Sequence, residues 1–418
     1  MNHGKVKLYL VLVIVFCLLL ATFISRNSGI AWFTLPFLCY LTAGLLTAPG
    51  NVNLRATREP DQVRGDAKTE FTMIVTLENS GDTIPRVHIY EEVQPLISLL
   101  DGTLEKDLTL SGGESYKLRY TFRAQRGVYC WSKLYASVSD PFELFEKKIE
   151  LSAPAEVIVV PDEFPTKQLR LHPRRTLRTA GPYLSRLAGS GVDYYGTREY
   201  HTGDSLRWVD WRLSARHPGQ FFSKEFEREG MANIGIILDG NAALDLHYGD
   251  EALFEYSVKA AAGIARNLIH AGNRVSLITL GEKVIRIFPG SGKTQLVNIF
   301  DQLARCQPGG NASLGTLKYL PVEFIPRHSL LILISPLQPG DFQAIANLRA
   351  REYQVILVSP DPVQYAHQSG YLPAAAHAAG VERQILLWRI REIGAQVIDW
   401  KVDQPLSSVT GVFSSTRE

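Results

Sequence analysis

The sequence predicts a multi-domain chain: an N-terminal transmembrane helical hairpin, then a β-sandwich, then an α/β domain with a doubly wound, mostly parallel sheet. Three observations predict this architecture. Two uncharged apolar spans open the chain, short alternating runs separated by turn residues fill residues 51–165, and buried strands alternate with amphipathic helices over residues 232–405. The 418 residues are enough for several hydrophobic cores, and 45% hydrophobic with 21% charged residues is typical of folded proteins.

The two apolar spans cover residues 8–24 and 30–48, with Arg26 as the one charge between them. Each approaches the roughly 20 residues that a helix needs to cross a bilayer. The flanking positive charges are Lys5 and Lys7 before the first span, and Arg55, Arg58 and Arg64 after the second. The positive-inside rule therefore predicts that both ends are cytoplasmic. A cleaved signal peptide is the alternative for the first span, but a second span after five residues favours a hairpin over residues 1–50.

We therefore expect a multi-pass protein of the cell's inner (cytoplasmic) membrane whose soluble domains lie in the cytoplasm. The cysteines fit a reducing compartment, because they show neither CxxC spacing nor an evident pairing: Cys17, Cys39, Cys130 and Cys306. A net charge of +2 gives no general attraction to nucleic acid, so no nucleic-acid partner is expected.

The β-sandwich is predicted from strands near 70–77, 87–90, 118–122 and 157–160, separated by turn clusters such as 79–82 and 111–113. It contains no catalytic pattern and is interpreted as a structural or docking module. Residues 166–231 form a polar connector rich in Gly, Arg and Asp, and residues 406–418 a C-terminal tail.

The α/β domain begins with the continuous apolar run 234–238, typical of a strand buried on both faces. Helical periodicity follows over 251–270. The remaining predicted elements alternate in the same way, with strands at 275–280, 284–288, 330–334, 355–359 and 396–400 and helices at 295–304, 342–351 and 381–393.

Asp239 ends the first of these strands, at the edge where α/β sheets bind ligands. A magnesium site there would use oxygen ligands at the second and fourth following positions, which hold Asn241 and Ala243. We therefore interpret Asp239 as a structural or helix-capping residue, with Mg²⁺ as the alternative and no other cofactor expected. Farther along, residues 288–294 resemble a phosphate-binding loop, but Ile287 stands where that loop needs glycine, so Gly292 is interpreted as opening a helix.

Residues 187–216 combine glycines, acid–base pairs and tryptophans without a hydrophobic period. Asp204 is expected to cap a short helix and to pair with Arg207, and Asp210 to pair with Arg216. Trp208 and Trp211 are expected on neighbouring parts of one helix.

Three interpretations of this segment stay open. The first is an arginine–carboxylate lattice that fixes an irregular connector, and the second is a surface for acidic or phosphate groups of a partner. The third is a catalytic acid/base pair of Glu199 with Asp204 or Asp210, although His201 and His217 stand alone and Ser214 has no evident base.

The same segment resembles the bacterial and archaeal "domain of unknown function 58" family. The residues that carry the resemblance are Gly189, Gly191, Asp193, Arg198, Glu199, Tyr200, Gly203, Asp204, Arg207, Asp210, Trp211, Ser214, Ala215 and Arg216. The stretches 126–129 and 140–145 support it.

The resemblance implies a von Willebrand factor A-like α/β domain that works with a MoxR-type AAA+ ATPase in the assembly or maturation of a client protein. Such domains often bind a cation through Asp-x-Ser-x-Ser and later hydroxyl and carboxylate ligands. Here the corresponding set is Asp239, Asn241, Ser313 and Ser335, so a degenerate site without metal is expected.

The sequence therefore predicts a membrane-anchored interaction or adaptor protein without catalytic activity, with no catalytic residues assigned. Its expected partners are the membrane, a MoxR-type ATPase and a client protein. Two alternatives from other classes are a hydrolase that acts on a phosphate-containing substrate at residues 187–216, and a cation-dependent adhesion module.

Overall fold

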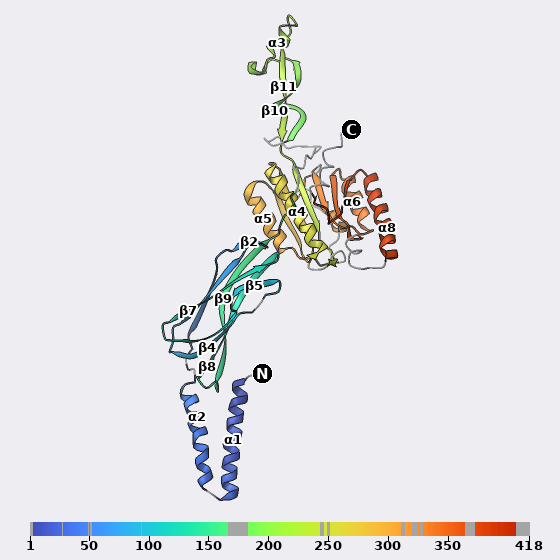
Figure 1. Cartoon of the computed structure of the whole chain (residues 1–418). Helices are drawn as coiled ribbons and strands as arrows, with labels where there is room; N and C mark the ends of the chain where they lie inside the picture. Colours follow the sequence, from blue (N-terminus) through green and yellow to red (C-terminus); the bar gives the residue numbers. More distant parts are fainter. Residues whose placement is uncertain are drawn as a thin grey trace. The chain divides into compact units, whose positions relative to one another are not determined.

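A computed structural model describes residues 3–26, 28–48, 50, 52–92, 94–165, 183–242, 246–248, 251–310, 314–319, 325–326, 329–363 and 373–406. The chain divides into two compact units, Met1–Val160 and Pro161–Glu418. The first unit contains two apolar helical segments and two β-sheets, and the second contains a two-stranded ribbon and an α/β sheet (Figure 1).

The N-terminal helices are long and apolar enough, by length and composition, to cross a membrane over Val6–Ser25 and Ser28–Leu46. The first is a single α-helix, α1 (His3–Ser25). The second span differs from the single helix expected, because it begins as a 3-10 helix, η1 (Ser28–Thr34), and continues as α2 (Leu35–Leu46). Pro36 lies in the first turn of α2, where its missing N–H removes no helical hydrogen bond.

The loop at residues 140–145 contacts both helices. The carboxylate of Asp140 is fully buried and accepts hydrogen bonds from three backbone N–H groups of the following turn, at 2.7 to 3.0 Å. Tyr40 of α2 meets the ring of Phe142 edge-on, with centroids 5.1 Å apart. Lys7 of α1 forms an ion pair with Glu143. This stretch, which supported the family resemblance, is therefore a structured turn at the helical hairpin.

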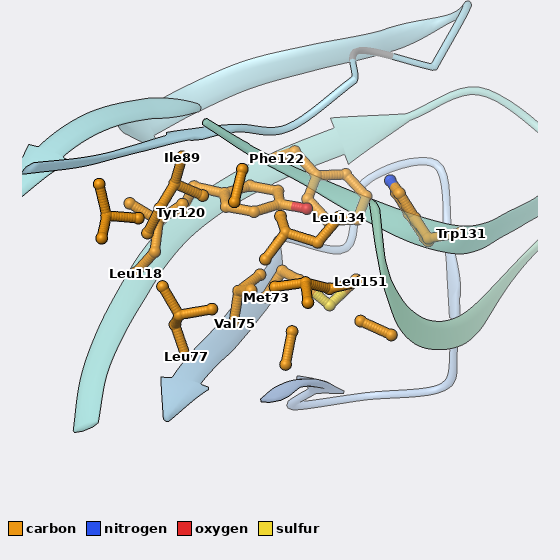
Figure 2. Close-up of a cluster of buried hydrophobic side chains, with 14 of the residues drawn as sticks. Met73, Val75, Leu77, Ile89, Leu118, Tyr120, Phe122, Trp131, Leu134 and Leu151 are labelled. Carbon is orange, nitrogen blue, oxygen red and sulfur yellow. The ribbon is translucent and has the colours of Figure 1, made fainter. Parts of the chain in front are cut away.

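Two sheets form the rest of the first unit. One has the order β1 (Leu54–Pro60), β3 (Phe71–Asn79), β7 (Ser115–Ala124), β5 (Ile97–Gly102). The other has the order β2 (Arg64–Asp66), β9 (Glu146–Val160), β8 (Gly127–Ser139), β4 (Ile84–Tyr90), β6 (Glu105–Leu110). Neighbouring strands are antiparallel except β2 and β9. Both sheets contribute to one hydrophobic core, centred on side chains such as Met73, Phe122 and Leu134 (Figure 2).

One ion pair is enclosed in this core. Arg58 of β1 is 5% exposed and donates from Nη2 to both carboxylate oxygens of Glu91, each at 2.8 Å; Glu91 is 1% exposed. The guanidinium also donates to the carbonyl of Ala153 and lies 5.9 Å from the ring centroid of Trp131. Burial raises the pKa of Glu91, and the hydrogen bond from Arg58 opposes that rise. The pair thus ties β1 to the chain after β4.

The α/β part of the second unit is a six-stranded sheet of order β16-β15-β12-β17-β18-β19. Its strands are β12 (Asn233–Asp239), β15 (Arg274–Leu280), β16 (Val284–Gly290), β17 (Leu330–Ile334), β18 (Gln354–Pro360) and β19 (Gln396–Trp400). All neighbours are parallel except β15 and β16, which form a hairpin. This mostly parallel sheet, with strand positions within two residues of those predicted, confirms the α/β reading.

Helices cover both faces of the sheet. Side chains of α6 (Asp341–Ala350), α8 (Pro373–Glu392) and η4 (Leu314–Tyr319) share one core with alternate residues of the central strands, including Ile237, Leu331 and Leu333. The helices α4 (Leu253–His270) and α5 (Gly292–Arg305) contact each other outside that core (Figure 1). This arrangement leaves the carboxyl ends of the parallel strands as one polar edge.

Candidate functional site

The signature segment forms a two-stranded antiparallel ribbon with a structured end. Its strands are β10 (Tyr183–Glu199) and β11 (Phe222–Gly230), with Glu199 opposite Phe222. The connecting residues 200–221, named the tip here, start with a hydrogen bond from the Tyr200 N–H to the Phe221 carbonyl at 2.7 Å. The predicted connector is therefore an ordered hairpin in this region.

One carboxylate organises the first half of the tip. Asp204 receives two hydrogen bonds from Arg198, at 2.8 and 2.7 Å, and a third from the His201 N–H at 2.9 Å. Gly203, just before it, has φ +111°, a conformation that favours glycine. The hydrogen bonds from Arg198 hold the pKa of the Asp204 carboxyl below its usual value. Asp204 is consequently held as an ionised acceptor, not as a proton donor.

The second carboxylate starts a short helix. Asp210 accepts a hydrogen bond from the Leu213 N–H at 3.0 Å and so caps α3 (Trp211–Ser214). Ser214 is buried and its hydroxyl accepts the Phe222 N–H at 3.0 Å, which joins α3 to β11. Both groups therefore satisfy backbone donors.

These contacts correct the expected pairings. Asp204 pairs with Arg198 instead of Arg207, and it caps no helix, because Ser205 precedes the 3-10 helix η2 (Leu206–Trp208). Asp210 caps α3, and within the described residues no ion pair joins it to Arg216. Trp208 and Trp211 belong to separate elements, η2 and α3. The i,i+3 spacing suggested one continuous helix, whereas the chain turns between two short ones.

Three apolar side chains of the tip are exposed to solvent. Leu206, Trp211 and Phe221 are 67%, 60% and 57% exposed, and the rings of Trp211 and Phe221 meet edge-on with centroids 6.4 Å apart. Three exposed arginines accompany them and form no ion pair with the described part of the chain: Arg207, Arg212 and Arg216. Sequence reasoning missed Leu206 and Phe221, since an isolated apolar residue in a polar loop carries no periodic signal.

Three glycine and aspartate residues of the signature, Gly189, Gly191 and Asp193, fall within β10. The register between β10 and β11 shifts between Gly189 and Tyr194, which places an irregularity at this glycine-rich stretch. Their side-chain surroundings lie outside the described residues.

The polar edge of the α/β sheet holds the second candidate site. The Ser335 hydroxyl donates to Oδ2 of Asp239 at 2.6 Å, and the Asn241 N–H donates to Oδ1 at 3.2 Å. Burial raises the pKa of Asp239 to about 6, and nearby Asp341 adds to that rise. Asp239 and Ser335, which the family resemblance groups in a degenerate site, are thus hydrogen-bonded to each other. Ser313, like Ala243, lies outside the described residues.

No group of three or more His, Cys, Asp or Glu side chains able to hold a metal ion occurs among the described residues. Asp341, whose charge raises the pKa of Asp239, is 5% exposed and accepts a hydrogen bond from the Gln338 N–H at 2.7 Å. Two buried carboxylates with few donors are a costly arrangement unless at least one is protonated.

A buried arginine, which sequence reasoning also missed, closes the neighbouring part of this edge. Arg383 of α8 is 7% exposed and donates to the Asp399 carboxylate at 2.7 Å and to the Ser359 hydroxyl at 3.0 Å. It also donates to the Pro336 carbonyl at 2.9 Å, next to Ser335. The only available signal was an arginine on the apolar side of a predicted helix.

The loop at 288–294 is a strand-to-helix turn. Gly292, with φ +79°, opens α5, and the side chain of Gln295 donates to the Val275 and Phe288 carbonyls at 2.7 and 2.9 Å. The glycine is thus explained by backbone geometry.

Comparison with solved structures finds only partial similarity. Proximal thread matrix protein 1 from the mussel byssus matches with 13% identity and a TM-score of 0.29, over 44% of this chain and 47% of its own. This chain thus spans about half of that protein. A FixG-related protein from Vibrio parahaemolyticus matches with 12% identity and a TM-score of 0.18, over 27% of this chain and 98% of its own. The VesB protease of Vibrio cholerae matches with 12% identity and a TM-score of 0.17, over 29% and 35%. These low TM-scores define no shared fold.

No curated protein matches the sequence. A family model does, over residues 196–364, and its description is "Protein of unknown function DUF58". The match covers the end of β10, the tip, β11 and most of the α/β sheet. This part of the chain therefore matches the DUF58 family.

Proposed function

We propose that this chain is a membrane-anchored, non-catalytic interaction protein of the inner membrane, with its soluble domains in the cytoplasm. The observation that carries the proposal is the state of the signature carboxylates. Asp204 is held ionised by Arg198, and Asp210 caps a helix. A general acid or base must be able to exchange a proton near its reacting group, and the hydrogen bonds already made by both carboxylates support a structural role for them.

The α/β domain supplies the interaction scaffold, and we assign it to the von Willebrand factor A-like class. The mostly parallel sheet covered on both faces supports this assignment. Its partner is a MoxR-type AAA+ ATPase, the partner implied by the family resemblance, and the two act on a client protein. Nucleotide hydrolysis belongs to the ATPase.

The test is affinity purification of the tagged full-length chain from its own membranes, with and without ATP. The expected result is a stoichiometric AAA+ ATPase whose retention depends on nucleotide. A chain that elutes alone under gentle detergent contradicts the proposal.

Two variants separate this proposal from hydrolysis at the tip. Asp204→Asn and Arg198→Met remove the two partners of one ion pair. If the chain is an interaction protein, both variants should make the tip less ordered, and neither the wild type nor the variants should hydrolyse a phosphate ester. A purified wild-type chain that hydrolyses a phosphate ester, and loses that activity in folded Asp204→Asn, would establish the hydrolase instead.

A further inference from the structure

The tip presents an apolar surface that its own folding does not use. Trp211 and Phe221 touch each other edge-on while each stays more than half exposed, and Leu206 is more exposed still. Burial of such side chains is the main source of binding free energy in protein interfaces, where Trp and Arg are the most enriched anchors.

The negative and positive side chains of the tip differ in whether they already have partners within the chain. Both of its carboxylates already accept hydrogen bonds, Asp204 from Arg198 and Asp210 from the backbone of α3. Its arginines, Arg207, Arg212 and Arg216, are exposed and make no ion pair with the described residues. Guanidinium groups in this state favour bidentate contacts with carboxylates.

The tip is also held in one conformation before any partner arrives. The Arg198–Asp204 pair, the Asp210 cap and the Ser214–Phe222 hydrogen bond fix the chain on both sides of Trp211. A preformed surface lowers the entropic cost of association and selects for shape. A lipid surface makes no use of such a fixed shape, so a folded protein fits these observations better than a bilayer does.

We propose that the tip, residues 200–221, binds a folded protein that presents an apolar recess bordered by carboxylates. Trp211 and Phe221 enter the recess, and the three arginines contact its acidic border. This inference rests on the proposed interaction function and specifies where and with what chemistry the contact is made.

The experiment places the photoreactive residue benzoylphenylalanine at position 211 of the full-length chain in its own membranes. Position 388 is the matched control, because Trp388 of α8 is 59% exposed, close to the 60% of Trp211. The expected result is a cross-link from position 211, and not from 388, to an apolar surface with Asp or Glu around it. The purified partner should then bind the Trp211→Ala variant at least about tenfold more weakly than it binds the wild type.

Binding should also become weaker when salt is added and in the Arg212→Glu variant, whereas the Trp388→Ala variant should bind as tightly as the wild type.

Several results would overturn the inference: cross-links from position 388 alone, cross-links to lipid alone, no cross-link from position 211, or binding that ignores salt and Arg212→Glu. A partner that co-purifies equally well with wild type and Trp211→Ala rejects the tip as the contact and leaves the interaction function standing. No co-purifying protein at all is the separate failure of that function. Equal melting temperatures of wild type and Trp211→Ala show that the comparison uses folded protein.

Discussion

The same chemical pair, an arginine bound to a carboxylate, occurs in two regions with opposite surroundings. In the sandwich, Arg58 and Glu91 are almost completely buried beside Trp131. At the tip, Arg198 and Asp204 keep side-chain exposures of 39% and 19%, and Trp211 of the same tip is 60% exposed. The buried pair belongs to a core that already encloses its aromatic ring. The tip pair orders a loop in which the rings of Trp211 and Phe221 stay exposed to solvent. This is the difference expected if the sandwich pair is structural and the tip is the proposed binding surface.

The largest loss of stability is expected where removing one partner leaves a buried charge without its ion pair. Arg58→Met leaves Glu91 without its main hydrogen-bond donor in the sandwich core. We expect a loss of about 3 to 5 kcal/mol in the free energy of unfolding, measured by chemical denaturation of the full chain in detergent. A loss below about 1 kcal/mol would mean that the buried pair behaves like an exposed one.

A buried carboxylate without an arginine extends the comparison. The pKa of Asp239 is raised from 3.8 to about 6, so in the folded chain it holds its proton to higher pH than in the unfolded chain. Its contribution to stability is therefore full below pH 3.8 and is lost as pH rises through about 6, a change of about 3 kcal/mol.

Asp239→Asn cannot ionise and should abolish that part of the pH dependence. The measurement is the difference in unfolding free energy between wild type and Asp239→Asn as a function of pH. A difference that stays constant across this range would contradict the burial argument. Isothermal calorimetry with Mg²⁺ adds a control, since heat that disappears in Asp239→Ala would establish a cation site.

At the tip, the pairing found in the structure predicts unequal effects for two arginines. Arg198→Met should speed hydrogen exchange of the tip amides, including the His201 N–H, which donates to the Asp204 carboxylate. The global melting temperature should change little. Arg207→Met is the matched control and should leave exchange unchanged, because Arg207 has no partner among the described residues. Equal effects of the two variants would restore the Asp204–Arg207 pairing that spacing suggested.

The smallest effect on stability is expected for Trp211, the more exposed of the two aromatic side chains that meet at the tip. Trp211→Ala removes a ring that is 60% exposed, so the unfolding free energy should change by no more than about 0.5 kcal/mol. Thermal unfolding next to the Trp388→Ala control measures this. A loss comparable to that of Arg58→Met would show that the ring is structural.

The elements of the fold could be predicted wherever one face or both faces of an element are buried. The continuous apolar run at 234–238 became β12, which is buried on both faces, and the alternation in 70–77 became β3, which is buried on one face. The apolar N-terminal spans were visible from their length and uniform hydropathy. At the sheet edge, only the family resemblance grouped Asp239 with Ser335, and in the structure the Ser335 hydroxyl donates to the Asp239 carboxylate.

The tip was less predictable, because polar geometry leaves no period. Asp204 has Arg198 six residues before it and Arg207 three residues after it. The structure pairs Asp204 with Arg198, and the turn at Gly203 lies between these two residues. From the sequence, Arg58 was likewise interpreted as one of the positive charges that flank the membrane spans. In the structure it is buried against Glu91, which lies 33 residues later in the sequence. Partners that are distant in sequence and chosen by tertiary structure give no local signal.

We propose that this protein binds its partner through the tip and not through the polar edge of the sheet. One experiment separates the two sites: it compares Trp211→Ala and Asp239→Asn for retention of the protein that co-elutes with the wild-type chain from its own membranes. We expect Trp211→Ala to lose this protein and Asp239→Asn to keep it, with both variants folded and equally abundant. Loss in Asp239→Asn together with retention in Trp211→Ala would instead place the binding site at the sheet edge.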